Sequence, residues 1–182
     1  ERPFFGKRGG ITFSGGEPTV QAEALIPLCR QLKAEGIHIC LDSQGSIRNR
    51  YVDELLSLVD MVLLDCKHIL PEAHRRLTTQ SNANTLATAE QLRQMGKPVR
   101  MRYVLVPGYS DQPEALHALG QRFGGYENIE RLELLPYHPY GKHKYETLGR
   151  AYPLEQVHEP THEEIAAAQE ILEQYFPVVW TQ

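Results

Sequence analysis

The sequence predicts an α/β protein built on a parallel sheet with helical crossovers. Short apolar runs alternate with helical patterns five times along the 182 residues, which is the arrangement that joins parallel strands. The five or six strands are too few for a closed eight-stranded barrel. Two architectures remain, an open doubly wound sheet and a partial barrel. In both, ligands bind at the carboxyl ends of the strands, so those ends hold the candidate site.

The first half of the chain contains three of the expected strands. The run GITFS at residues 10–14 is rich in β-formers. Residues 20–35 have apolar side chains at helical spacing, and Gly36 accepts the positive φ that ends a helix. The sequence then continues as strand, helix and strand over 37–42, 50–58 and 60–67.

The second half repeats the alternation. A helix over 84–95 ends at Gly96, and a strand over 98–106 leads to a helix over 113–123 and a strand over 129–135. The last helix, 161–176, begins with Thr161 and Glu164 at the spacing of a capping box. A short final strand is expected at 178–181.

Composition is that of a single folded domain over residues 1–182. Hydrophobic residues make up 41%, charged residues 23%, and the net charge is −4. A chain of this length buries a sizeable core. The chain lacks the excess of basic residues that would indicate a nucleic-acid partner. No apolar run reaches the ~18 residues of a membrane span. The three cysteines form no disulfide framework or CxxC pair, which favours a reducing, cytoplasmic location.

Charged side chains follow neighbouring strands of the expected sheet. Glu17 follows two glycines, Asp42 ends the second strand, and Asp65 and Lys67 share one face at the end of the third. Arg102 lies in the apolar fourth strand, where a buried guanidinium needs a carboxylate partner. One interpretation is a tight turn and strand-end ion pairs. The other is a site whose carboxylates bind a hard cation or an ammonium group.

The stretch 136–160 has no clear periodicity but is rich in tyrosine and histidine. Structureless loops longer than ~12–15 residues are usually functional or disordered, and the aromatic content favours a lid or a partner-docking surface. A zinc site formed by His138 and His143 is disfavoured, because no further ligand has matching spacing. The three cysteines, each expected to be a small buried hydrophobe, are Cys29, Cys40 and Cys66.

Five motifs occur in a fixed order: GGITFSGGEP, GIHICLDSQG, DMVLLDCKH, VRMRYVLVPGYSD and LELLPYHPYGKHKY. Together they resemble the activating enzymes of glycyl radical enzymes, within the radical S-adenosylmethionine superfamily. The resemblance covers the chain from Gly10 onward. It implies a partial (β/α)6-type barrel of parallel strands, here missing the first strand and the cluster loop.

The resemblance implies a cofactor site position by position. Gly15, Gly16 and Glu17 fall on the segment that binds the amino group of S-adenosylmethionine, largely through backbone. Lys67 falls on the lysine near the cofactor carboxylate, and Arg102 on an arginine that contacts the cofactor. The remaining implied contacts are Val104, through its backbone to adenine, and His138 beside the cofactor.

A monovalent cation is also implied beside the methionine carboxylate. Its ligands would be Asp42, Ser43, Asp65 and the carbonyl of Leu63. The family usually has threonine where this chain has Ser43, so a hydroxyl is kept.

The family's CxxxCxxC motif, which holds a [4Fe–4S] cluster, does not occur in this sequence. We therefore expect the chain to be the C-terminal portion of a longer enzyme, to contain no catalytic residue of its own, and to be inactive alone. The intact protein is expected to use S-adenosylmethionine and the cluster to form a 5′-deoxyadenosyl radical. That radical would take a hydrogen atom from a glycine of the partner enzyme.

The implied partners are a glycyl radical enzyme, pyruvate formate-lyase first, and a flavodoxin-type electron donor, with no nucleic acid and no membrane. Two alternatives stay open: an activator of a different glycyl radical enzyme, and a non-catalytic module that binds S-adenosylmethionine or a partner. An unrelated phosphate- or sugar-binding domain is disfavoured, because the sequence has no GxGxxG and no P-loop.

Overall fold

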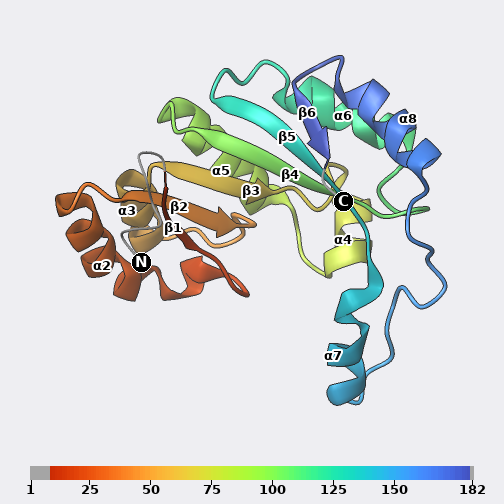
Figure 1. The fold of residues 1–182 in the computed structure, drawn as a ribbon, viewed down its shortest axis with the longest axis horizontal. Coiled ribbons are helices and arrows are strands. Elements are labelled where there is room, and N and C mark those ends of the chain that lie inside the picture. The colour runs from red at the N-terminus through yellow and green to blue at the C-terminus, as the bar shows by residue number, and fades with distance from the viewer. Residues whose placement is uncertain (1–8, 181–182) are drawn as a thin grey trace.

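The computed structural model describes residues 9–180, which form a six-stranded sheet with strand order β1-β2-β3-β4-β5-β6 (Figure 1). Every neighbouring pair is parallel. The strands are β1 (Gly10–Phe13), β2 (His38–Ser43), β3 (Met61–Asp65), β4 (Val99–Leu105), β5 (Ile129–Pro136) and β6 (Val178–Trp180). Thr181, the expected last residue of the sixth strand, lies outside the described residues.

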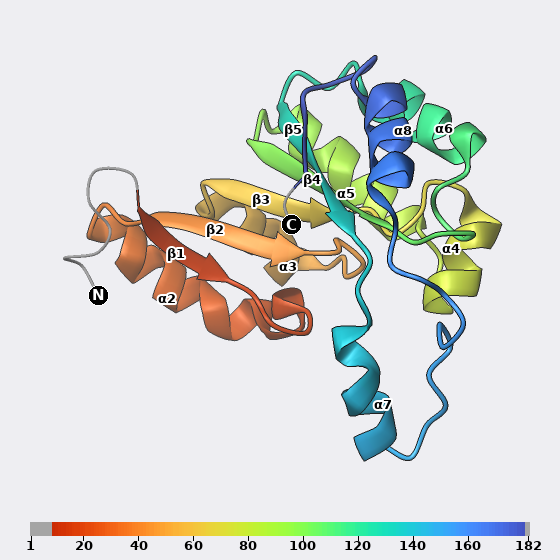
Figure 2. The same ribbon diagram turned by 45° about the vertical axis from the view of Figure 1, so that its right-hand side comes forward.

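Sequential strand order decides between the two expected architectures. A doubly wound sheet reverses direction at a switch point, whereas here each strand lies beside the next strand in sequence. Because parallel crossovers are right-handed, such a sheet receives its helices on one face, and Figure 2 shows α2, α3, α5, α6 and α8 on that face. The expected partial barrel is therefore confirmed.

The connecting segments are mostly helical. They are η1 (Pro18–Gln21), α2 (Ala22–Ala34), α3 (Arg50–Leu58), α4 (Pro71–Thr78), α5 (Ala83–Gln94), α6 (Pro113–Phe123), η2 (Pro139–Gly141), α7 (Lys142–Thr147) and α8 (His162–Leu172). α2 packs beside α3, and α6 beside α8. No helix within residues 9–180 has both the length and the apolar character needed to cross a bilayer.

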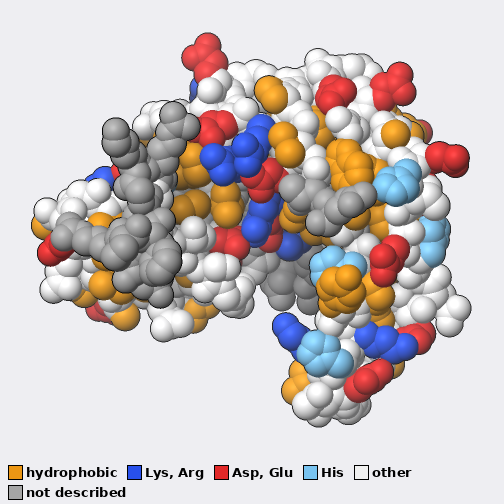
Figure 3. All heavy atoms as spheres, viewed as in Figure 1, with side chains coloured by type: hydrophobic (Ala, Val, Ile, Leu, Met, Phe, Trp, Pro, Cys, Tyr) orange, Lys and Arg blue, Asp and Glu red, His pale blue; other side chains and the backbone are white. Residues whose placement is uncertain are grey.

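The core lies between the sheet and these helices. Along β4, fully buried residues alternate with half-buried ones, because successive side chains point to opposite faces of a strand. A row of aligned residues on the helix side runs through Leu64, Met101 and Leu132, all fully buried. The other face carries polar residues: Figure 3 shows basic and acidic side chains gathered across its middle, flanked by hydrophobic ones.

Two regions of the chain depart from the sequence prediction. α4 was not expected; it buries only Ala73 and His74, so its apolar periodicity is weak. The stretch 136–160, expected to be without regular structure, contains η2 and α7. Neither η2 nor α7 has a buried residue, which leaves no hydrophobic pattern to detect. Figure 2 shows α7 standing away from the body of the protein.

The start of α8 confirms the predicted capping box. The Thr161 hydroxyl accepts a hydrogen bond from the backbone N–H of Glu164 at 3.2 Å. The Glu164 carboxylate in turn accepts from the Thr161 N–H at 2.7 Å. Both bonds satisfy N–H groups that the first helical turn leaves without partners.

Candidate functional site

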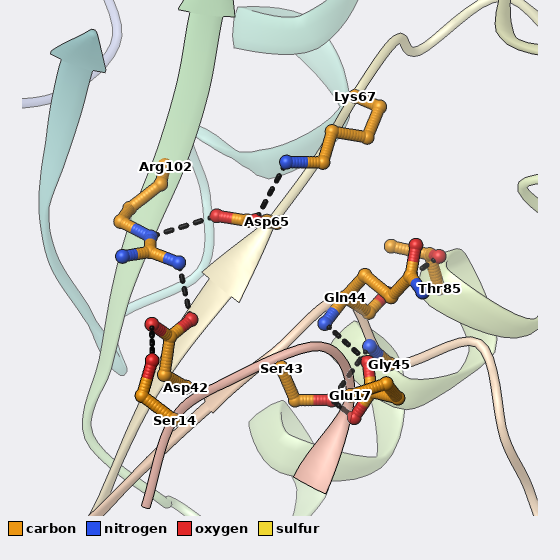
Figure 4. A network of polar contacts seen from close by, with 10 residues as sticks. All are labelled: Ser14, Glu17, Asp42, Ser43, Gln44, Gly45, Asp65, Lys67, Thr85 and Arg102. Atoms are coloured by element: carbon orange, nitrogen blue, oxygen red, sulfur yellow. Dashed lines mark hydrogen bonds and ion pairs between the residues drawn. The ribbon is translucent and has the colours of Figure 1, made fainter. Parts of the chain in front are cut away.

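Asp42, Asp65, Lys67 and Arg102 form one network at the carboxyl ends of β2 and β3 and beside them at the middle of β4 (Figure 4). Arg102 Nε donates to Asp65 Oδ1 at 2.7 Å, and its Nη2 donates to Asp42 Oδ1. Lys67 Nζ donates to Asp65 Oδ2 at 2.7 Å. Ser14 Oγ donates to the remaining oxygen, Asp42 Oδ2, at 2.8 Å. Each of the four carboxylate oxygens therefore accepts one hydrogen bond.

Partial burial strengthens this network. The Arg102 side chain is 19% exposed, and those of Asp42 and Asp65 are 18% and 16% exposed. Burial alone lowers the pKa of Arg102, but the charges and hydrogen bonds of Asp65 and Asp42 raise it above the ordinary value. The guanidinium stays charged, and two carboxylates balance two cationic groups. Such a balanced set can exchange its internal partners for those of a zwitterionic ligand.

Glu17 follows Gly16 and joins the loops after β1 and β2. Its carboxylate accepts from the Thr19 backbone N–H at 3.1 Å and from the Thr19 hydroxyl at 2.6 Å. It also accepts from Ser43 Oγ at 2.8 Å and from the Gln44 N–H at 3.0 Å. Three of these four donors bind Oε1 and one binds Oε2, so the Glu17 side chain holds the two loops together.

Ser43 lines the same cavity as Asp42 and Asp65, but its hydroxyl donates to Glu17. In sheet register it is aligned with Leu64 of the buried row, so its side chain points to the helix side while Asp42 points to the other. The structure brings Asp42 and Asp65 together through Arg102 but turns the Ser43 hydroxyl toward Glu17. Within residues 9–180 no group of three or more His, Cys, Asp or Glu side chains is placed to hold a metal ion.

A small polar cavity of about 140 Å³ opens at this network. Gly15 has φ +132°, which L side chains rarely adopt, and a Cβ at Gly15 or Gly16 would meet no atom within 4 Å. The backbone here is thus open to a ligand. The lining residues are Gly15, Gly16, Asp42, Ser43, Gln44, Asp65, Lys67 and Arg102.

A second cavity, of about 570 Å³, lies where β5 ends beside α8 and β6. The His138 ring lies against the Tyr140 ring at an interplanar angle of 36° with centroids 4.3 Å apart, and His162 meets Trp180 edge-on at 5.9 Å. Its size and aromatic lining suit a planar apolar group. The lining residues are Leu135, Pro136, Tyr137, His138, Tyr140, Glu159, His162, Ile165 and Trp180.

Val104 lies on the half-buried face of β4, aligned with Leu135 of β5, and Leu135 lines this second cavity. Of the implied residues, His138 lines the aromatic cavity, and Val104 lies in register beside its lining residue Leu135. Leu63 lines a separate cavity with Cys40 and Arg100, and Glu17 bonds Ser43 and Gln44 beside the polar cavity. The remaining implied residues line the polar cavity itself.

Several residues at the polar network and the aromatic cavity were not predicted from the sequence. Ser14 directly precedes the two glycines, so its position at a strand end was a usable signal. Trp180 is the single tryptophan of the chain, but nothing in its sequence context points to His138. His162 and Glu159 reach the same cavity only through the folding of 136–160 back to the sheet.

The cysteines are buried, as expected, at positions 29, 40 and 66. Burial raises the pKa of all three thiols, that of Cys66 to about 12. Iron–sulfur clusters need grouped thiolates. The cysteines of this chain therefore do not fit a [4Fe–4S] cluster.

Residues 2–119 match the family described as the Radical SAM superfamily. The pyruvate formate-lyase-activating enzyme of Staphylococcus aureus is 44% identical over 174 residues, which cover 92% of this chain and 69% of that protein.

Solved structures share the fold. A domain of pyruvate-formate lyase-activating enzyme from Bacteroides vulgatus matches with TM-score 0.78 and 22% identity, covering 95% of this chain and 99% of that one. SuiB of Streptococcus suis, bound to S-adenosylmethionine, matches with TM-score 0.72 and 12% identity over 95% of this chain and 39% of that one. The chain therefore belongs to the radical SAM superfamily and is related to the pyruvate formate-lyase-activating enzymes.

Proposed function

We propose that this chain binds S-adenosylmethionine at the carboxyl ends of β1 to β5 and serves the activation of a glycyl radical enzyme, pyruvate formate-lyase. The observation that carries the proposal is the balanced quartet of Asp42, Asp65, Lys67 and Arg102 beside an open glycine backbone. This arrangement suits a ligand with an amino and a carboxylate group. The 44% identical relative supports the choice of partner enzyme.

The methionine part of the cofactor would occupy the polar cavity. Arg102 and Lys67 would turn from Asp65 toward the ligand carboxylate, because a guanidinium fork and an ammonium both pair well with carboxylates. The backbone carbonyls of Gly15 and Gly16 would accept hydrogen bonds from the ligand amino group. The two aspartates, released from part of their internal pairing, would then face positive charge from the ligand.

A monovalent cation remains part of the proposal, with fewer ligands than the resemblance implies. Asp42, Asp65 and the Leu63 carbonyl would supply its oxygen ligands once Arg102 has turned to the cofactor. The Ser43 hydroxyl would join them only by giving up its 2.8 Å bond to Glu17.

The adenine would occupy the aromatic cavity. Leu135 and His138 line it, and the backbone of Val104 lies in register beside Leu135. Stacking on His138 and Tyr140 would hold a purine ring, since aromatic faces prefer offset contacts with other rings.

A [4Fe–4S] cluster supplies the electron that cleaves S-adenosylmethionine in this superfamily. Residues 9–180 hold no grouped thiolates for it, so the proposal assigns to this chain the binding and orientation of the cofactor. A flavodoxin-type electron donor and a cytoplasmic location are proposed on the family resemblance. The same lack of cluster ligands favours a second candidate, a cofactor- or partner-binding role without catalysis by this chain alone.

Isothermal titration of the chain with S-adenosylmethionine tests the proposal. We expect saturable binding to one site per chain. Arg102→Lys should weaken it, because lysine keeps the charge but loses the planar guanidinium that bonds two acceptors at once. Arg100→Lys is the matched control, since Arg100 pairs with the half-exposed Glu130 away from the quartet. A folded chain that releases no heat with S-adenosylmethionine would contradict cofactor binding and leave partner binding as the function.

A further inference from the structure

Helix α5 makes a set of hydrogen bonds that its helical pattern does not require. Thr85 Oγ1 donates to the Gln44 carbonyl at 2.7 Å, and Thr88 Oγ1 donates to the Gly45 carbonyl at 2.9 Å. Both acceptors lie in the loop that follows β2. Figure 4 shows Thr85 reaching Gln44 next to the Glu17 network.

The same helix also holds the loop after β3. Asn82, which directly precedes α5, donates through Nδ2 to the Ile69 carbonyl at 2.7 Å and to the His68 carbonyl at 3.2 Å. Its side chain makes no capping bond to its own helix. Asn82 therefore gives up the usual role of a residue at this position and binds a neighbouring loop. We call Asn82, Thr85 and Thr88 the α5 clamp.

Burial shows that these bonds are built into the fold. Asn82, Thr85 and Thr88 are 2%, 4% and 3% exposed. A buried polar side chain is costly unless it is hydrogen-bonded, and an apolar residue in its place would leave the loop carbonyl without this hydrogen bond, which is unfavourable. Each side chain of the clamp donates its hydrogen bond to a loop carbonyl and thereby fixes the position of that loop.

Both loops lead directly to the polar cavity. The loop at 44–49 begins with Gln44, whose N–H binds Glu17. Gly45 has φ +64°, and a Cβ there would lie 3.0 Å from Leu64 and 3.1 Å from Thr88. The loop is thus pressed against α5.

The other loop, 66–70, carries Lys67 and also contains an internal hydrogen bond. His68 is 1% exposed, and its Nδ1 accepts from the Leu70 N–H at 3.0 Å. One helix therefore sets the positions of two walls of the cavity.

We propose that Asn82, Thr85 and Thr88 are positioning residues for S-adenosylmethionine, acting through the loops that present Gln44 and Lys67. The proposal rests on the proposed function, because it assumes that the polar cavity binds this cofactor. Ligand groups held a fraction of an ångström out of place lose much of their binding energy. Loss of one clamp bond is expected to weaken cofactor binding about tenfold, because a loop that is no longer bonded to α5 would occupy the binding-competent position only part of the time.

Thr85→Val and Thr88→Val test the proposal, because valine keeps the shape of threonine and loses only the hydroxyl. Titration with S-adenosylmethionine should show about tenfold weaker binding for each. Thr85→Ser keeps the hydroxyl and should restore most of the affinity. Asn128→Ala is the matched control: Asn128 Nδ2 makes a bond of the same kind to the Lys97 carbonyl at 2.8 Å, at the opposite, amino-terminal edge of the sheet.

Hydrogen exchange gives a readout that does not depend on the cofactor. In Thr85→Val the N–H of Gln44 should exchange faster, while amides of the β4–β5 core stay protected as in the parent chain. If the parent chain fails to bind S-adenosylmethionine, the proposed function fails, and this exchange measurement still decides the clamp. Unchanged exchange at Gln44, or valine variants that bind as tightly as the parent chain, would overturn the inference.

Discussion

The carboxylate of Asp65 accepts a 2.7 Å hydrogen bond from Nε of Arg102, the residue directly opposite it in the β3–β4 register. Parallel strands place residues of equal register on the same face of the sheet. The two charges thus meet at the strand ends without any loop to guide them, and the same guanidinium reaches Asp42 of the next strand. The site is therefore fixed mainly by strand pairing.

Replacing Arg102 should destabilise the protein. Arg102→Lys keeps one positive charge but cannot bond both aspartates at once. We expect the free energy of unfolding to fall by about 1–2 kcal/mol, in line with the loss of charge-assisted hydrogen bonds. Urea unfolding followed by circular dichroism measures this change. Arg100→Lys, at an exposed ion pair, should change it by less than about 0.5 kcal/mol; equal effects of both variants would contradict the central place of Arg102.

Glu17→Gln should loosen the loops after β1 and β2. The amide can accept at only one oxygen, whereas the carboxylate accepts four hydrogen bonds. The NH2 group of the glutamine would then face an N–H or O–H group that had donated to the carboxylate. The free energy of unfolding should fall by about 1–3 kcal/mol because buried donors are left unsatisfied, and thermal unfolding would measure this change. Glu23→Gln, at an exposed position of α2, serves as control, and an unchanged melting temperature for Glu17→Gln would count against the network.

Acid should remove a contribution that Asp60 makes to stability. Burial alone raises its pKa, but Lys33 and the Ile39 N–H at 2.8 Å lower the pKa below the ordinary value of 3.8. A carboxyl with a lowered folded-state pKa stabilises the protein above its unfolded pKa, and this contribution disappears as the pH falls through the folded pKa. The difference in unfolding free energy between the parent chain and Asp60→Asn should shrink between about pH 5 and pH 2. A difference independent of pH would exclude this contribution.

The Cys66 thiol should be unreactive in the folded protein. It is fully buried, and burial raises its pKa to about 12. The thiolate is the reactive form, so a disulfide reagent near pH 8 should label Cys66 only after unfolding in urea. Peptide mass mapping identifies the labelled site. Rapid labelling of Cys66 in the native chain would show that this strand end opens to solvent.

Fluorescence of Trp180 should report occupation of the aromatic cavity. It is the single tryptophan and lines the same cavity as His138. We expect S-adenosylmethionine to change its emission and His138→Ala to reduce that change at least several-fold by removing the stacking partner. Free methionine, which lacks the purine, serves as control and should leave the emission unchanged. An equal response to methionine would contradict the assignment of adenine to this cavity.

Much of this site could be predicted from the sequence. The glycines before Glu17 and the charged residues at positions 42, 65 and 67 stand at or just after strand ends, where parallel sheets place their ligands, and Arg102 lies within β4 beside Asp65. Alternation also predicted that Asp65 and Lys67 share a face, and they form an ion pair. The helix at α4 and the helical part of 136–160 were missed because so few of their residues are buried.

The sequence by itself determined the alternation of strands and helices, the parallel sheet, and the charged residues at the strand ends, since these depend on local spacing. Only the tertiary structure decided that the sheet is singly wound, that Ser43 turns to Glu17, and that α5 holds the loops at Gln44 and Lys67. It also brought His138 and Trp180 to one cavity. These relationships join residues that are distant in sequence, and the pairing of strands and the packing of helices establish them, which no local pattern specifies.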